Sequence, residues 1–124
     1  MGEHVGNRLT IRYCDGAEAS LQEALRHIPA HLKDRCIAQF VARRNLLADG
    51  EQMRKPEHFN TEGALPDGGN FFAIKTTQGL RAYGWFSSRH RHVFFISHFV
   101  FKNYDKLKRA DEDLVRRNWE KEER

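Results

Sequence analysis

The chain has 124 residues, of which 40% are hydrophobic, 31% charged and 11% aromatic, and its formal net charge at pH 7 is +4. This length predicts one domain with a modest core, and the many charged residues are typical of a soluble protein. No apolar run approaches the ~18 residues that a membrane span requires. The first ten residues lack the apolar segment of a signal peptide, so we expect a cytoplasmic protein.

Cysteine and histidine spacing argues against a metal site or another cofactor. Cys14 and Cys36 are too few and too isolated for a disulfide framework or a zinc site, so we expect two reduced thiols. His90, His92 and His98 have no cysteine or carboxylate at ligand spacing, so we expect no metal there.

The first half of the chain reads as a strand followed by two helices. Apolar and polar residues alternate over Arg8–Cys14, which predicts a short strand. Helical spacing of apolar residues predicts a first helix over Ala17–Ile28, closed by Pro29. A second helix is expected over Ala30–Ala48, with Gly50 suited to the left-handed position after its last turn. Two helices joined at a proline predict a helical hairpin.

Residues 51–70 are polar and rich in Gly, Pro, Asn and Asp, which predicts a loop. A loop of this length in a compact domain is either mobile or functional.

The second half reads as three strands and a helix. The strands Phe71–Thr76, Leu80–Phe86 and His92–Lys102 have short connections and predict an antiparallel meander. The last strand is apolar on both faces, so we expect it to be central. A helix should begin near Asp105, and residues 119–124 should fray. The whole order predicts an α+β domain with helices packed on a small, mostly antiparallel sheet.

Charge and aromatic residues are concentrated in one stretch. Residues 71–110 carry eight Lys/Arg and one Asp/Glu, a net charge of +7, while the rest of the chain is nearly balanced. Ten of the fourteen aromatic residues lie between positions 70 and 109. Cations bind phosphates and aromatic faces stack on bases, so this centre indicates a surface that binds a polyanion.

Strand alternation places five polar side chains on one sheet face: Lys75, Arg81, Tyr83, His98 and Lys102. The same alternation puts Phe94 and Ile96 on that face, and Val93, Phe95, Ser97, Phe99 and Phe101 on the opposite face as core. None of the possible cations has an acidic neighbour in sequence, and like charges repel unless a phosphate binds between them. Such a cluster also suits RNA cleavage, in which the 2′-OH attacks its own phosphate while side chains move protons and stabilise the phosphorane.

Each of these residues also has a purely structural interpretation. Arg81 on a strand is often a solvated charge, and His98 in an apolar strand is often a hydrogen-bonded core histidine. Tyr83 and Trp85 are more often packing residues than platforms for bases. The sequence leaves both interpretations open.

Four consecutive motifs carry a family resemblance: FFAIK with Lys75, LRAYGWF with Arg81, ISHFVFKN with Phe99 and Lys102, and KLKRAD with Ala110. Over residues 71–118 this succession resembles the RelE/ParE toxin superfamily of type II toxin–antitoxin systems, and within it the HigB-like, phage-derived branch. Residues 1–50 match only in the order of elements. The resemblance implies a single RelE-like domain over residues 1–124 with the order β-α-α-β-β-β-α.

The resemblance also implies an activity and partners. It implies a metal-independent endoribonuclease, an mRNA interferase that acts on mRNA at the ribosome, inhibits translation and arrests growth until a cognate antitoxin neutralises it. Lys75 and Arg81 would contact RNA phosphates, Lys102 would stabilise the transition state, and Tyr104 would stack on a base or assist proton transfer. Strand geometry adds His98 to the catalytic set. The expected RNA-binding set is Lys75, Tyr83, Lys106, Lys108 and Arg109.

Two departures from the family pattern support a different function. Phe101-Lys102 stands where the family has paired lysines, and Gly84 stands where it has a bulky residue. Because ParE-like members poison DNA gyrase without nuclease residues, the alternative is a non-catalytic toxin or interaction module, such as a gyrase-type poison. A third interpretation is a housekeeping RNA-binding domain.

Overall fold

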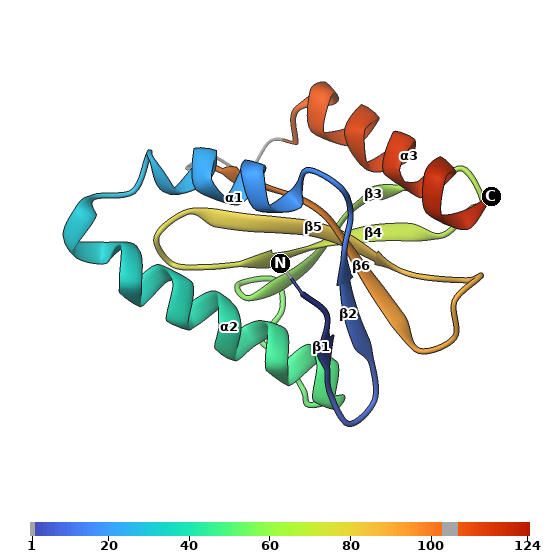
Figure 1. Ribbon diagram of the computed structural model, residues 1–124, viewed down its shortest axis with the longest axis horizontal. Coiled ribbons are helices and arrows are strands. Elements are labelled where there is room, and N and C mark those ends of the chain that lie inside the picture. Colours follow the sequence, from blue (N-terminus) through green and yellow to red (C-terminus); the bar gives the residue numbers. More distant parts are fainter. Residues whose placement is uncertain (1, 103–106) are drawn as a thin grey trace.

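The computed structural model describes residues 2–102 and 107–124 and has an α+β architecture (Figure 1). One six-stranded mixed sheet has the order β1-β2-β6-β5-β4-β3. The strands are β1 (His4–Val5), β2 (Thr10–Tyr13), β3 (Phe59–Ala64), β4 (Asn70–Lys75), β5 (Leu80–Phe86) and β6 (Val93–Phe101). The helices are α1 (Ala17–Leu25), α2 (Lys33–Asp49) and α3 (Arg109–Glu123), with a short 3₁₀ turn at Ala30–Leu32. Within the described ranges, no helix combines the length and apolar character needed to cross a membrane.

The expected first strand and helical hairpin are confirmed as β2, α1 and α2. Helix α1 follows Gly16, which has a φ of 86°, and its apolar stripe packs on the sheet through Leu21 and Leu25. Helix α2 ends at Gly50, whose φ of 75° is the left-handed conformation expected there.

Strand β6 is central, as its two apolar faces predict. It lies between β2 and β5, pairing antiparallel with β5 and parallel with β2. Thr10 is opposite Val93 in the parallel pair, so the first long strand joins the sheet beside the last. Strand β1 extends the sheet beyond β2, and its two residues are too few to show a periodic pattern.

The prediction of an uninterrupted loop over residues 51–70 is wrong, because β3 lies within it and pairs antiparallel with β4. The strand has the sequence FNTEGA, in which Phe59 is the one large apolar residue. Its register shifts between Thr61 and Gly63, so Glu62 is the extra residue of a bulge. An edge strand with a bulge and few apolar residues lacks the alternation by which strands are recognised.

Helices cover both faces of the sheet. Helices α1 and α2 pack on the face that carries Leu80 and Ala82. Helix α3 packs on the other face, with Trp119 in one cluster with Tyr83 and Trp85. The predicted alternation along β5 is therefore confirmed.

The predicted alternation along β6 is wrong in its first half because of a second bulge. Tyr83 is opposite His98, but Gly84 is opposite Ile96, so Ser97 is the extra residue. One extra residue exchanges the two faces of a strand. Phe94 and Ile96 consequently join the core under α1 and α2, and Val93 and Phe95 join the core under α3.

The end of the chain does not fray as predicted; α3 continues to Glu123. The Glu123 carboxylate accepts hydrogen bonds from the Ser87 hydroxyl at 2.6 Å and from the backbone N–H groups of Ser88 and Arg89 at 2.8 and 3.0 Å. The Ser88 hydroxyl adds a fourth bond at 3.0 Å. This carboxylate therefore fastens the end of α3 to the turn between β5 and β6.

Both cysteines are free and buried. Burial, followed by the nearby Glu122 and Asp15, raises the pKa of Cys14 to about 12. This thiol therefore stays protonated at neutral pH, and a protonated thiol is a poor nucleophile.

Gly84 is required by the second bulge. A Cβ atom at this position would meet the carbonyl oxygen of Phe95 and the ring of Phe94. Gly84→Ala is expected to lower the free energy of unfolding by about 3 kcal/mol, because the central pair β5–β6 would have to separate. Urea unfolding checks this, with Gly2→Ala as the control, since nothing lies within 4 Å of a Cβ there. Equal stabilities would show that the bulge adjusts freely.

The fastening of α3 should depend on pH. Burial raises the pKa of Glu123, but the hydrogen bonds from Ser87, Arg89 and Ser88 outweigh it and lower the pKa overall. The stabilisation is therefore present above the ordinary pKa of 4.5 and is lost as pH falls through the lowered pKa. Glu123→Gln should reduce the unfolding free energy by about 1 kcal/mol at pH 7, with the difference disappearing at acid pH. Glu120→Gln is the control, and a difference independent of pH would contradict the assignment.

Candidate functional site

The predicted polar side chains do gather on one face of the sheet, beneath the start of α3. Lys75 on β4 is directly opposite Arg81 on β5, and Arg81 is opposite Val100 on β6. Lys102 follows the last residue of β6 on the same face. We call Lys75, Arg81 and Lys102 the basic cluster.

The basic cluster lines a cavity of about 410 Å³ at the β4–β5 hairpin, which we call the basic pocket. The other lining residues are Glu57, Thr76, Thr77, Gln78 and Gly79. Arg81 is 8% exposed and Lys102 is 3% exposed, so the pocket wall contains two buried cations. Buried cations in a cavity bind an anion more strongly than surface cations do, because water screens them less.

Glu62 supplies a counter-charge that was not recognised from the sequence. Its Oε1 lies 3.7 Å from Nη1 of Arg81, and the two side chains are 7% and 9% exposed. Among the described residues, this oxygen has no hydrogen-bond partner. Glu62 is the extra residue of the β3 bulge, so the segment that was expected to be a loop delivers the carboxylate to the basic cluster.

Lys102 has an altered acidity. Burial lowers its pKa and Arg81 lowers it further, while Glu62 and Asp111 act in the opposite direction. Its Nζ donates a hydrogen bond to the Tyr83 hydroxyl at 3.4 Å. Compared with an ordinary lysine, Lys102 releases its proton more readily.

His98 is a hydrogen-bonded core histidine in this structure. Its Nε2 lies 3.0 Å from Oδ1 of Asp111 on α3, and its Nδ1 lies 2.8 Å from Oγ of Ser97. Asn118 Nδ2 donates to the same Ser97 Oγ at 2.8 Å. His98 therefore connects β6 to α3, and its partner Asp111 is too distant in sequence to have been recognised.

Tyr83 and Trp85 are packing residues in this structure. Both are fully buried; the Tyr83 ring packs edge-on against Phe71 and lies 5.4 Å from the His98 ring. Burial raises the pKa of Tyr83, with Glu62 and Asp111 adding to the effect. The expected contact of Tyr83 with RNA does not fit this burial, since no ring face is open to a base.

The remaining candidates lie at the start of α3 or outside the described residues. Lys108 and Arg109 are exposed at the N-terminus of α3, and the charge of Lys108 contributes to the lowered pKa of Lys102. Tyr104 and Lys106 lie outside the described residues.

Arg43 on α2 reaches the same end of the sheet. It is buried, and its Nη1 donates a hydrogen bond to the carbonyl oxygen of Lys75 at 2.5 Å. Its Nη2 lies 3.0 Å from Nε2 of His58. In sequence Arg43 lies off the apolar stripe of its helix and gives no sign of these contacts.

In the part of the chain that the structure describes, no three His, Cys, Asp or Glu side chains are grouped so as to hold a metal ion. No family model matches this chain, and no curated protein or solved structure is significantly similar to it. The basic pocket offers cations positioned for a phosphate group and a lysine of lowered pKa beside an arginine.

The balance between Arg81 and Glu62 is testable. Arg81→Met leaves the Glu62 carboxylate buried, so it should lower the free energy of unfolding by about 3 kcal/mol. The double variant Arg81→Met/Glu62→Gln should recover at least half of that loss. Arg26→Met is the control, because Arg26 and its partner Glu23 are exposed and such pairs contribute little. Denaturant unfolding measures all three, and no recovery in the double variant would show that Glu62 is not the counter-charge.

Proposed function

We propose that this protein is a toxin-type endoribonuclease that cleaves mRNA without a metal ion. The observation that carries the proposal is the burial of Arg81 and Lys102 together in the wall of the basic pocket, with Lys75 beside them. Glu62 compensates part of this positive charge, and a bound anion would compensate more of it. A phosphodiester is an anion of suitable size, and the same cations would stabilise its transition state.

The order of the elements supports the proposal. After β2 come two helices, then antiparallel strands that end in β6, and then α3. This is the order that the resemblance to RelE-like toxins implies, with β1 and β3 as additional strands. Lys75, Arg81 and Lys102 occupy the strand ends at which that resemblance places RNA-binding residues.

The proposal gives a role to each member of the basic cluster. The RNA 2′-hydroxyl loses its proton to solvent water and its oxygen attacks the adjacent phosphorus, the bond from phosphorus to the 5′-oxygen breaks, and a 2′,3′-cyclic phosphate and a 5′-hydroxyl result. Arg81 would neutralise the non-bridging oxygens, and Lys102 would donate a proton to the leaving 5′-oxygen. Lys75 would hold a neighbouring phosphate. His98 would act as a positioning residue, since its bond to Asp111 connects α3 to the strand that precedes Lys102.

The proposal includes a partner and a cellular setting. A cognate antitoxin with acidic segments would neutralise the basic cluster, and the substrate would be mRNA in the cytoplasm, bound at the ribosome. Tyr104, which lies outside the described residues, stays a predicted residue for stacking on a base or assisting proton transfer.

A non-catalytic toxin of the gyrase-poison kind is the alternative. It is favoured by the burial of His98 and Tyr83, which removes one expected catalytic residue and one expected RNA-binding residue from the basic pocket. In this alternative the basic cluster binds a partner and breaks no bond.

Induced expression distinguishes the two functions. The wild-type chain should arrest growth rapidly and produce new mRNA 5′ ends inside open reading frames. Lys102→Met should abolish both effects with the protein still folded, because methionine fills a similar volume and Arg81 remains as the partner of Glu62. The melting temperature of the purified variant checks that it folds. Lys121→Met is the control, since Lys121 is largely exposed.

The contrary outcomes are equally specific. Arrest with intact transcripts and a DNA-damage response would favour the gyrase-type alternative. Full toxicity of Lys102→Met would remove Lys102 from the mechanism. No arrest by soluble wild-type protein would refute the toxin function.

A further inference from the structure

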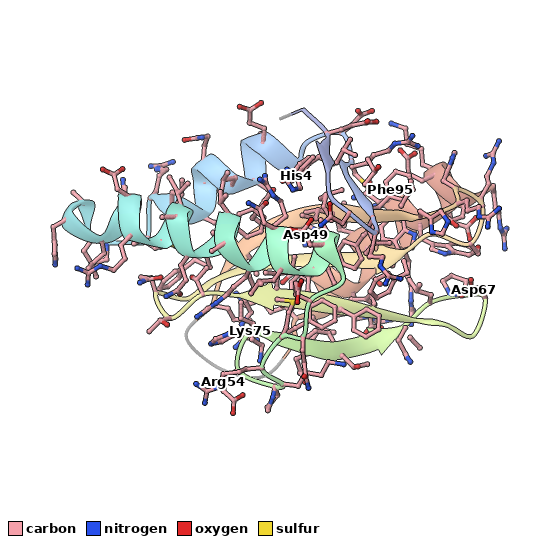
Figure 2. The ribbon with its side chains drawn as sticks, turned by 90° about the horizontal axis from the view of Figure 1, so that it is seen from below. His4, Asp49, Arg54, Asp67, Lys75 and Phe95 are labelled. Carbon is pink, nitrogen blue, oxygen red and sulfur yellow. The ribbon has the colours of Figure 1, made fainter. Side chains whose placement is uncertain are left out.

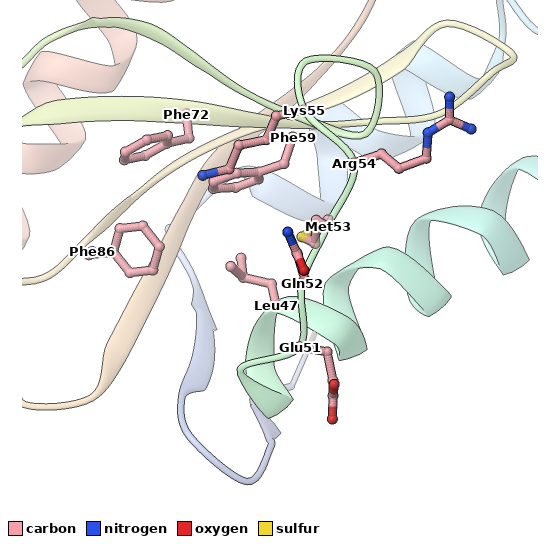
Figure 3. Close-up of a pocket in the computed structure, with 9 residues that line it drawn as sticks. All are labelled: Leu47, Glu51, Gln52, Met53, Arg54, Lys55, Phe59, Phe72 and Phe86. Carbon is pink, nitrogen blue, oxygen red and sulfur yellow. The ribbon is translucent and has the colours of Figure 1, made fainter.

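A second and larger cavity, of about 760 Å³, opens on the opposite face of the sheet, beside the end of α2 (Figure 3). We call it the aromatic pocket. Its apolar wall consists of Leu47, Met53, Phe59, Phe72 and Phe86. Its polar rim consists of Glu51, Gln52, Arg54 and Lys55. Phe72 and Phe86 belong to the motifs FFAIK and LRAYGWF, but the sequence analysis assigned no functional role to either residue.

Phe86 is the unusual member of the apolar wall. It is the last residue of β5, whose six other residues are all buried, yet it is 43% exposed. Its ring lies 5.4 Å from Phe72 and 4.9 Å from Phe94, steeply inclined to both. Its ring also lies 6.4 Å from that of Phe59, and Figure 3 shows it across the pocket from Met53 and Gln52. A phenyl ring held firmly by its neighbours and open to the cavity is a platform for a flat ligand.

Cations crowd the rim of the same pocket. Lys55 Nζ lies 5.9 Å from the centre of the Phe59 ring. Burial lowers the pKa of Arg43, and Arg54 lowers it further. Burial, Arg43 and Arg54 together lower the pKa of His58, against a smaller opposing effect of Glu57. Arg43 and Arg54 repel each other, and a bound anion would relieve the repulsion; Glu51 is an acidic residue on the same rim.

The two pockets are neighbours connected by basic residues. Arg54 lines the aromatic pocket, Arg43 interacts with it through space, and Arg43 donates a hydrogen bond to the backbone of Lys75 in the basic pocket. Figure 2 shows Arg54 and Lys75 at the same end of the molecule, below α2. Arg54 and Lys55 line the aromatic pocket and Glu57 lines the basic pocket, so the turn over residues 54–58 lies between the two cavities. A chain molecule that crosses this turn would reach both.

We propose that the aromatic pocket is a nucleotide subsite for single-stranded RNA, in which a base near the scissile phosphate stacks on Phe86, its phosphate binds Lys55, and Arg54, which Figure 3 shows on the side away from Phe86, binds the next phosphate along the chain. This proposal rests on the proposed function for the identity of the polymer. A nucleotide joins an aromatic ring to a negative charge, which is the combination that this wall and rim complement. An apolar peptide side chain would contact the aromatic rings alone and would not reduce the repulsion between the cations. Stacking also tolerates different bases, in keeping with a largely apolar wall.

Binding of an RNA that cannot be cleaved tests the subsite without catalysis. The probe is a fluorescein-labelled oligonucleotide of about six residues, 2′-O-methylated throughout, and fluorescence anisotropy gives its affinity. Phe86→Leu keeps an apolar side chain but removes the aromatic face, so it should weaken binding about tenfold. Ile37→Ala is the matched control, because Ile37 is 38% exposed on α2 and outside the aromatic pocket. Melting temperatures check that both variants fold.

Abasic substitutions identify the stacked base. Replacing one nucleotide at a time by an abasic residue should weaken wild-type binding about tenfold at one position. The Phe86→Leu variant should bind the abasic oligonucleotide no more weakly than the intact oligonucleotide, because the variant has no aromatic ring at position 86 on which that base could stack. Equal losses in both proteins, or an unchanged affinity of Phe86→Leu, would overturn the subsite and leave the pocket to a protein partner. Absence of wild-type binding at low salt would also overturn it.

These outcomes are separate from the proposed function. One outcome is that the abasic substitution weakens binding to the wild type but not to Phe86→Leu, while ordinary RNA of the same sequence stays intact. This outcome would refute the nuclease activity and support the nucleotide subsite. If ordinary RNA is cleaved and Phe86→Leu binds like the wild type, the nuclease remains and the subsite fails.

Discussion

The interaction on which the rest of this structure depends is the compensation of two buried cations. Arg81 and Lys102 lie on one sheet face, almost out of contact with water, and each raises the electrostatic energy of the other. Counter-charges come from two sides: Glu62 from the edge strand β3 and Asp111 from the covering helix α3. Helix α3 buries only Val115 and Trp119 fully among the described residues, so its polar contacts to β6 and to the β5–β6 turn matter for its position. Strand β3 at the edge of the sheet and helix α3 on one of its faces (Figure 1) are thus connected to the basic cluster through Glu62 and Asp111.

Two bulges determine where the polar side chains near the basic cluster point. The bulge in β3 presents Glu62, and the bulge in β6 presents Ser97 to His98 and Asn118. Bulges are common beside functional sites, because an extra residue redirects a side chain without ending the strand. Gly84 faces the β6 bulge, where any side chain would meet the backbone of Phe95. In the sequence, Gly84 is a departure from the family pattern that suggests a loss of function. In the structure, local packing explains this glycine.

Sequence patterns predicted those parts of the fold that depend on neighbouring residues. The β5 strand has the expected bounds, α2 ends at the expected glycine, and Lys75, Arg81 and Lys102 share the expected face. The misses involve partners that no periodic pattern indicates, including Asn70, which pairs with nearby Ala64. Strand β3 forms because β4 offers it an edge, and Glu123 holds α3 because a turn some thirty-five residues earlier donates to it. No periodic pattern in the sequence indicates the buried pairing of His98 with Asp111 or the cations around the aromatic pocket.

The parallel pairing of β2 with β6 has a consequence for how the chain is made. A ribosome delivers β2 first, but its partner strand begins only at Val93, after both helices and three further strands. The sheet is therefore incomplete until most of the polypeptide has emerged, and contacts over such a separation form slowly. Lys102 comes later still, directly after the strand that closes the sheet. The nascent chain thus acquires its central strand and its most buried cation in the same late step, so a fragment cut short by interrupted synthesis has neither.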